Sequence, residues 1–137
     1  MALSIKAGIY NKLVSLAITP YIYHRELPQN PRYPATVYNV VSDVAINHTH
    51  DNLVVGFRRA RVQIDVYALS VEEAEVAMEA YFAALAGFQG SIGDGFSPSQ
   101  FTDVSIFDEG ANPDLDYEEE PTLRNLEARS RDFMILY

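Results

Sequence analysis

Apolar and polar residues alternate strictly through residues 59–68, the clearest pattern in the chain. A strand with one buried face requires this period of two. A second alternation over Thr36–Ile46 predicts another strand, with Asn39 and Asp43 on its polar face. The residues between them, His48–Asn52, have the composition of a turn, so we expect a long antiparallel hairpin. Its expected buried positions are Tyr38, Val40, Val44, Ile46, Ala60, Val62, Ile64, Val66 and Ala68.

Two other segments repeat their apolar residues every three or four positions, as amphipathic helices do. The first is Ser4–Ala17, which ends before Pro20. The second begins at a capping box formed by Ser70 and Glu73, and Gly87 or Gly90 can end it. The apolar stripes of the two helices are Ile5, Ile9, Leu13 and Leu16, and then Val71, Ala74, Met78, Tyr81, Leu85 and Phe88.

The remaining segments are expected to be two further strands and three loops. The strands are Phe101–Phe107 and Leu126–Tyr137, and the loops are Tyr21–Pro34, Gln89–Gln100 and Asp108–Pro121. Short connections make each strand pair antiparallel. We therefore expect a single α+β domain over residues 1–137, in the order α-β-β-α-β-β. Its antiparallel sheet should have about four strands, with both helices on one face and a polar opposite face.

Charge and composition exclude several classes of function. The net charge is −9, from nineteen acidic and ten basic residues, so the chain should repel a phosphate backbone. DNA could still pass such a surface without binding. The absence of cysteine excludes disulfides and thiolate metal sites. No stretch approaches the roughly 20 apolar residues of a membrane span, and Met1–Leu16 lacks the apolar run of a signal peptide.

Candidate chemistry is sparse. His48, His50 and Asp51 could hold zinc, copper or nickel, but the sequence specifies no third ligand at a fixed spacing and polar turn residues are the simpler interpretation. The acidic stretch after Asp108 lacks the residue order of an EF-hand. No phosphate-binding loop or hydrolase motif is present in the sequence. We therefore expect neither enzymatic activity nor a cofactor.

The basic residues Arg58, Arg59 and Arg61 cluster at the start of the second strand. They are either a solvated strand end or one half of an electrostatic contact between neighbouring copies of the chain. The other half would be the acidic loop, whose candidate residues are Asp114, Asp116, Glu118, Glu119 and Glu120. Nine tyrosines and seven phenylalanines could supply additional interface anchors.

The order of these segments resembles the tail-completion or tail-terminator proteins of long-tailed bacteriophages, also called head-to-tail joining proteins. The resemblance covers nearly the whole chain and starts with a helix followed by a proline-broken segment. The matching segments are Tyr21-Ile-Tyr-His-Arg-Glu-Leu-Pro28-Gln, Tyr33-Pro34-Ala-Thr-Val-Tyr38, Ala60-Arg-Val-Gln-Ile-Asp65-Val-Tyr67, Ser70-Val-Glu-Glu-Ala74 and Ser130-Arg-Asp-Phe133.

This resemblance implies a structural virion protein that forms a ring, usually of six copies, at the head-proximal end of the tail. Such a ring stops polymerisation of the tail tube, contacts the major tail tube protein and a head-completion or neck protein, and leaves a channel for DNA. It would assemble in the host cytoplasm. Two alternatives stay open: a neck or head-closure component, and a stand-alone module that binds a ligand or metal near His48 and His50.

Overall fold

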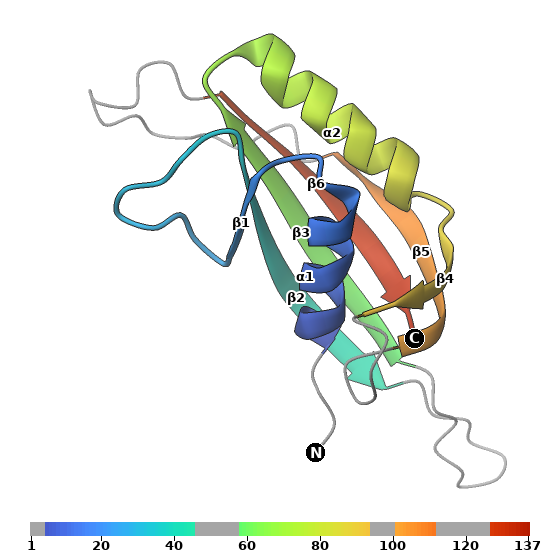
Figure 1. Cartoon of the computed structure of the whole chain (residues 1–137). Helices are drawn as coiled ribbons and strands as arrows, with labels where there is room; N and C mark the ends of the chain where they lie inside the picture. Colours follow the sequence, from blue (N-terminus) through green and yellow to red (C-terminus); the bar gives the residue numbers. More distant parts are fainter. Residues whose placement is uncertain (1–4, 46–57, 94–100, 112–126) are drawn as a thin grey trace, which may run out of the picture.

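The computed structural model describes residues 5–45, 58–93, 101–111 and 127–137 of the chain (Figure 1). Two helices and six strands follow one another in the order α-β-β-β-α-β-β-β. The elements are α1 (Ile5–Leu16), β1 (Tyr21–His24), β2 (Ala35–Ala45), β3 (Arg58–Ala68), α2 (Val71–Leu85), β4 (Gln89–Ile92), β5 (Phe101–Ala111) and β6 (Glu127–Leu136).

All six strands belong to one mixed sheet in the order β1-β2-β3-β6-β5-β4. Only β1 and β2 are parallel, and every other neighbouring pair is antiparallel. The expected α+β fold with a four-stranded antiparallel sheet and the order α-β-β-α-β-β is therefore wrong, because the protein is mostly β. The two additional strands, β1 and β4, have four residues each and lie in segments expected to be loops. The long hairpin of β2 and β3 is confirmed.

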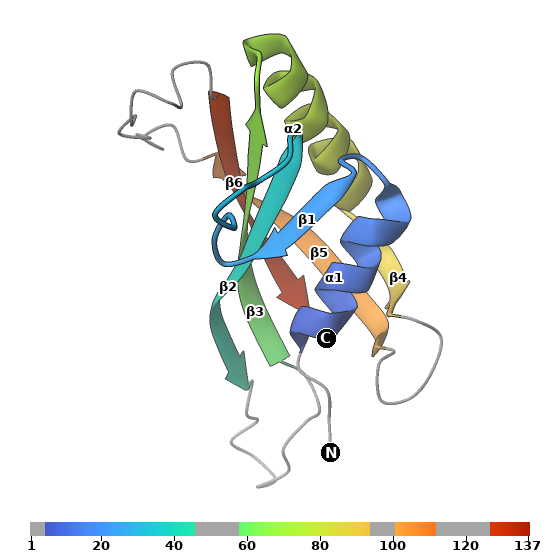
Figure 2. The same ribbon diagram turned by 60° about the vertical axis from the view of Figure 1, so that its left-hand side comes forward.

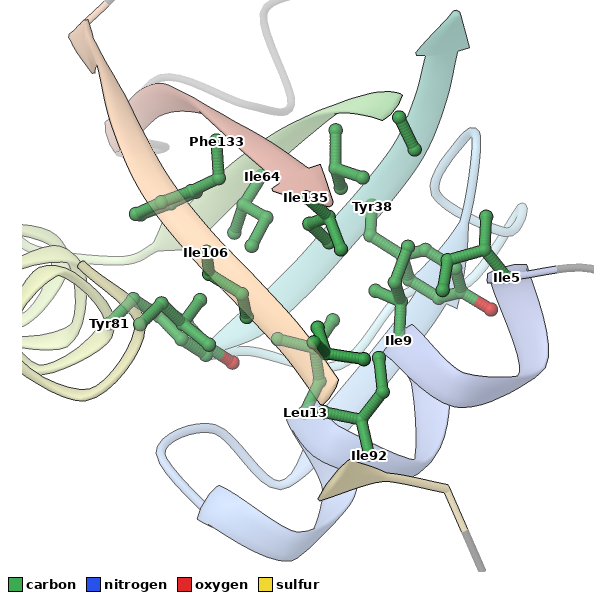
Figure 3. Close-up of a cluster of buried hydrophobic side chains, with 14 of the residues drawn as sticks. Ile5, Ile9, Leu13, Tyr38, Ile64, Tyr81, Ile92, Ile106, Phe133 and Ile135 are labelled. Atoms are coloured by element: carbon green, nitrogen blue, oxygen red, sulfur yellow. The ribbon is translucent and has the colours of Figure 1, made fainter. Parts of the chain in front are cut away.

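Both helices pack on the same face of this curled sheet (Figure 2). The expected stripe of α1 is buried at Ile5, Ile9 and Leu13, which belong to the same core as the alternating apolar residues of β3. Phe133 and Ile135 of β6 and Ile106 of β5 belong to the same core, together with Tyr81 of α2 (Figure 3). Removing this apolar surface from water is the main force that holds the helices against the sheet. No helix in the described part of the chain has the length and apolar character needed to cross a membrane.

Two sets of hydrogen bonds hold α2 in place, one at the cap of its first turn and one at a buried hydroxyl group further along the helix. The Ser70 hydroxyl accepts a hydrogen bond of 3.2 Å from the backbone N–H of Glu73, as the sequence predicts. Tyr81 is fully buried, and its hydroxyl lies 2.7 Å from that of Thr36, which in turn lies 2.7 Å from that of Thr19. The buried phenol oxygen is thus paired, as a polar group in an apolar core must be.

A β-bulge changes which residues of β2 face the core. The pairing register of β2 with β3 shifts between Val40 and Ser42, so the residues after the bulge point to opposite sides from those expected. Asp43 now lies on the helix-covered face, and Val44 is 49% exposed on the other face. The predictions that Val44 is buried and that Asp43 lies on the polar face are therefore wrong. Ile46, the last residue of the predicted strand, lies outside the described residues.

The face of the sheet opposite the helices is not uniformly polar, in contrast to the expectation. At one end, Val37 and Tyr67 are buried and pack with Tyr23, Leu27, Tyr33 and Ala128. Leu27 and Tyr33 belong to the segment between β1 and β2, which therefore covers this end of the sheet. The remainder of this face is left uncovered by the described residues, and we call it the open face. Its exposed large apolar residues include Val44 and Phe107.

Candidate assembly surfaces

The three arginines at the start of β3 do not form one patch. Residues alternate between the two sides of a strand, so Arg58 lies on the helix-covered side, whereas Arg59 and Arg61 lie on the open face. The sequence cluster Arg58, Arg59 and Arg61 is thus divided between two surfaces. Each arginine has a different set of neighbours, and these decide whether it is available to a partner.

Arg58 is engaged within its own chain at the end of the sheet. Its Nε lies 3.3 Å from Oδ1 of Asp43, and the hydroxyl of Tyr137 donates a 2.7 Å hydrogen bond to the other carboxylate oxygen. The backbones of Arg58 and Tyr137 also exchange two hydrogen bonds. Burial, the hydrogen bond to Asp43 and the charge of Asp43 raise the pKa of Tyr137 well above its usual range, so this hydroxyl remains a donor. These contacts join the ends of β2, β3 and β6.

Arg61 is also paired within the chain, at the centre of the open face. Both its Nε and Nη2 contact Oδ2 of Asp132, at 2.9 and 2.8 Å, and Asp132 is largely buried. Beside this pair, the carboxylate of Asp65 accepts hydrogen bonds from Gln63 and Ser130. Burial raises the pKa of Asp65, and the nearby charge of Asp132 raises it further, while the two hydrogen bonds oppose the shift. The arginine and its acidic neighbours form an internally satisfied polar cluster.

Arg59 is exposed, and no carboxylate among the described residues pairs with it. In the sheet register it lies between Val44 of β2 and Leu136 of β6. The adjacent row of the open face places Met134 beside Phe107, which is 47% exposed. A cation with exposed or half-buried apolar neighbours is a typical component of a protein interface. Arg59 is therefore the arginine of the predicted cluster that is best placed to contact a partner.

The acidic half of the predicted contact lies outside the described residues. This applies to Asp114, Asp116, Glu118, Glu119 and Glu120, and equally to His48 and His50 of the alternative metal site. Within the part of the chain that the structure describes, no group of three or more histidine and acidic residues is placed to hold a metal ion. The contact between the arginines and the acidic loop stays a prediction.

The helix layer carries a second exposed apolar surface, which the sequence analysis missed. Tyr10 and Val14 of α1 are 44% and 48% exposed, and they line a groove of about 420 Å³ with Pro20 and Ile22. The missed signal is the spacing of four between Tyr10 and Val14, which places them together on a helix side next to the buried stripe. The buried stripe alone does not predict this second row.

A larger groove lies beside the first half of α2. Its volume is about 540 Å³, and Val76, Glu72 and Glu73 of α2 form part of its wall. Val76 is 63% exposed although it lies in the middle of a helix. Ion pairing on this helix occurs at Glu75, which lies 3.3 Å from Nη2 of Arg129, whereas Glu72 and Glu73 have no cationic partner among the described residues. We call this the α2 groove. Its complete lining is Ile18, Pro34, Ser70, Glu72, Glu73, Val76, Ala77 and Ala80.

Comparison with other proteins gives no family assignment. No protein-family model matches the chain, and a search of curated proteins gives no match. The resemblance to tail-completion proteins therefore stays a prediction from the sequence.

Proposed function

We propose that this chain is a structural assembly protein that closes into a ring of identical copies at the head-proximal end of a bacteriophage tail. In this role the ring stops growth of the tail tube and joins the tail to the head. The proposal takes the family and a ring of about six copies from the sequence resemblance. The described residues supply an independent physical argument for self-assembly.

The observation that carries the proposal is the exposure of apolar residues on two opposite sides of one small domain. Val44 and Phe107 are exposed on the open face, and Tyr10, Val14 and Val76 are exposed on the helix layer. A ring of identical subunits requires two different surfaces that fit one another, because each copy contacts its two neighbours through different patches. A domain with apolar surfaces on opposite sides meets this requirement.

The proposed partners follow from the position of such a ring. One rim would contact the last ring of the major tail tube protein, and the other would contact a head-completion or neck protein. The net charge of −9 suits a channel through which DNA passes without specific binding. The place of action would be the virion, with assembly in the host cytoplasm.

Mass measurement of the purified chain tests this function, first alone and then with tail tubes assembled from the tube protein encoded in the same genome. We expect a closed oligomer in at least one of these conditions, and electron microscopy should show it at one end of each tube. Addition of the chain during tube growth should also shorten the tubes. A chain that stays monomeric and does not bind tube ends would contradict the proposal.

A further inference from the structure

We propose that neighbouring copies in the ring are held in register by a charge-paired contact. In this contact, Arg59 on the open face of one copy enters the α2 groove of the next copy and pairs with Glu72 and Glu73. The inference rests on the proposed ring function, and it specifies the two surfaces that meet. It also replaces the acidic loop with a described acidic surface as the partner of the basic strand.

The basic half of the contact is selected by the pairing of the three arginines. Arg58 is paired with Asp43 and Arg61 with Asp132, so part of the charge of each is already balanced within the chain. Arg59 keeps no such partner within the described residues and stands between Val44 and Leu136. A guanidinium in an apolar setting is weakly hydrated and well suited to an interface ion pair.

The acidic half is selected by the same criterion. Glu75 is paired with Arg129, whereas Glu72 and Glu73 lack a cation in the part of the chain described here. They line one side of the α2 groove, and Ile18 and Val76 supply apolar surface in the same groove. The groove can therefore receive a side chain that has a cationic end and apolar neighbours, which are the features of Arg59.

A second copy of this chain is the occupant that the charges favour. The two halves lie on opposite sides of the sheet, so no copy can bring its own Arg59 to its own Glu72. Copies with a net charge of −9 repel one another, and an arginine placed against two glutamates offsets part of this repulsion at each contact. Because the two halves differ, each copy uses one for each neighbour, and the contact propagates in one direction around a ring.

Charge reversal at each half tests this contact under the conditions in which the wild-type ring forms. Arg59→Glu brings a negative charge to the acidic α2 groove. Glu72→Arg places a positive charge in the groove that receives Arg59. We expect each variant alone to need an about tenfold higher concentration to assemble. An equimolar mixture should assemble like the wild type, because the reversed surfaces fit one another and the two unchanged surfaces also fit. Native mass spectrometry should then show equal numbers of both variants in each ring.

Arg32→Glu is the matched control, since it makes the same change of charge at an exposed position in the segment between β1 and β2. It should assemble like the wild type, and it should not restore assembly of Glu72→Arg when the two are mixed. Circular dichroism and thermal unfolding must show that all variants are folded. Two results would overturn the contact: both reversed variants assemble like the wild type, or their folded mixture does not regain assembly. Either result would leave the ring proposal intact. A wild-type chain that forms no ring with or without tubes would overturn both proposals.

Discussion

The face of the sheet beneath α1 and α2 is covered by apolar side chains along its length, whereas the opposite face is covered at one end only. On the helix-covered face, the expected stripes of α1 and β3 meet in one continuous core. On the open face, the segment between β1 and β2 covers Val37 and Tyr67, and the other end keeps Arg59 and Val44 exposed. The contrast indicates that one face serves folding and that the open end of the other is available for contacts with partners.

Two phenylalanines on adjacent strands provide the sharpest test of this contrast. Phe133 of β6 is 1% exposed beneath the helices, and Phe107 of β5 is 47% exposed on the open face. We expect Phe133→Ala to lower the free energy of unfolding by about 3–5 kcal/mol, because it leaves a cavity in the core. Phe107→Ala should change it by less than about 0.5 kcal/mol. Urea unfolding of both variants measures this difference, and equal losses would show that the open face is as important for folding as the core.

The two acidic partners of the arginines test the same contrast among charged residues. Asp132→Ala removes a largely buried carboxylate that accepts a hydrogen bond from Nε of Arg61 and forms an ion pair with its Nη2, so we expect a loss of about 2 kcal/mol. Asp43→Ala removes a more exposed carboxylate at the end of the sheet, which pairs with Arg58 and accepts a hydrogen bond from Tyr137. Both contacts are exposed to solvent, so the loss should be smaller, about 1 kcal/mol. Denaturant unfolding at neutral pH compares the two, and a larger loss for Asp43→Ala would contradict this ranking.

Much of the helix-covered face could be predicted from the sequence. The alternation of β3 and the stripe of α1 are local patterns, and the buried positions Ile9, Val62 and Ile64 agree with them. The Ser70 cap is local as well. These features depend on residues that are close in sequence, so periodicity and capping rules are sufficient to find them.

The rest of the sheet depends on contacts between residues that are far apart in sequence. β1 has four residues and is a strand because it pairs in parallel with β2. β4 is equally short and pairs with β5 at the opposite edge. The bulge near Val41 is hidden because Val40 and Val41 are both apolar, so the sequence does not show where the alternation shifts. Tertiary pairing, and not local propensity, decides these elements.

The candidate site was only partly predictable for the same reason. The sequence shows that Arg58, Arg59 and Arg61 are clustered, but their partners Asp43 and Asp132 come from other strands. Only the folded chain shows that two of the three arginines are already paired. The exposure of Val76, in contrast, agrees with the sequence, because this residue is not part of the apolar stripe expected for the second helix.

A buried hydroxyl on the helix-covered face should contribute less to the free energy of unfolding than either core packing or the pair of Arg61 and Asp132. Tyr81→Phe removes a phenol oxygen that lies 2.7 Å from the hydroxyl of Thr36. Thr36 keeps its 2.7 Å contact with Thr19, so no hydroxyl is left unpaired. We therefore expect a loss of about 1 kcal/mol in the free energy of unfolding. Thr36→Val breaks both contacts and should cost more, and a neutral Thr36→Val would show that this network does not stabilise the core.

The smallest expected effect concerns Asp65 and appears as a dependence on pH. Burial raises the pKa of this carboxyl group from its ordinary value of 3.8, so the folded chain holds the proton more tightly than the unfolded chain. Its contribution to stability is therefore fully present below pH 3.8 and is lost as the pH rises through the folded pKa. Asp65→Asn removes this titration and can still accept a hydrogen bond from Gln63.

The stability of Asp65→Asn relative to the wild type should consequently increase from pH 3.8 upward and become constant above the folded pKa. Urea unfolding across this range measures the difference at each pH. Glu26→Gln, which neutralises an exposed acid in the segment between β1 and β2, is the control for loss of one negative charge. A difference that decreases with rising pH would mean that the carboxylate of Asp65 is stabilised on the open face. The polar cluster beside Arg61 would then stabilise the charged form of Asp65. The cluster would thus contribute to folding stability, as the core beneath the helices does.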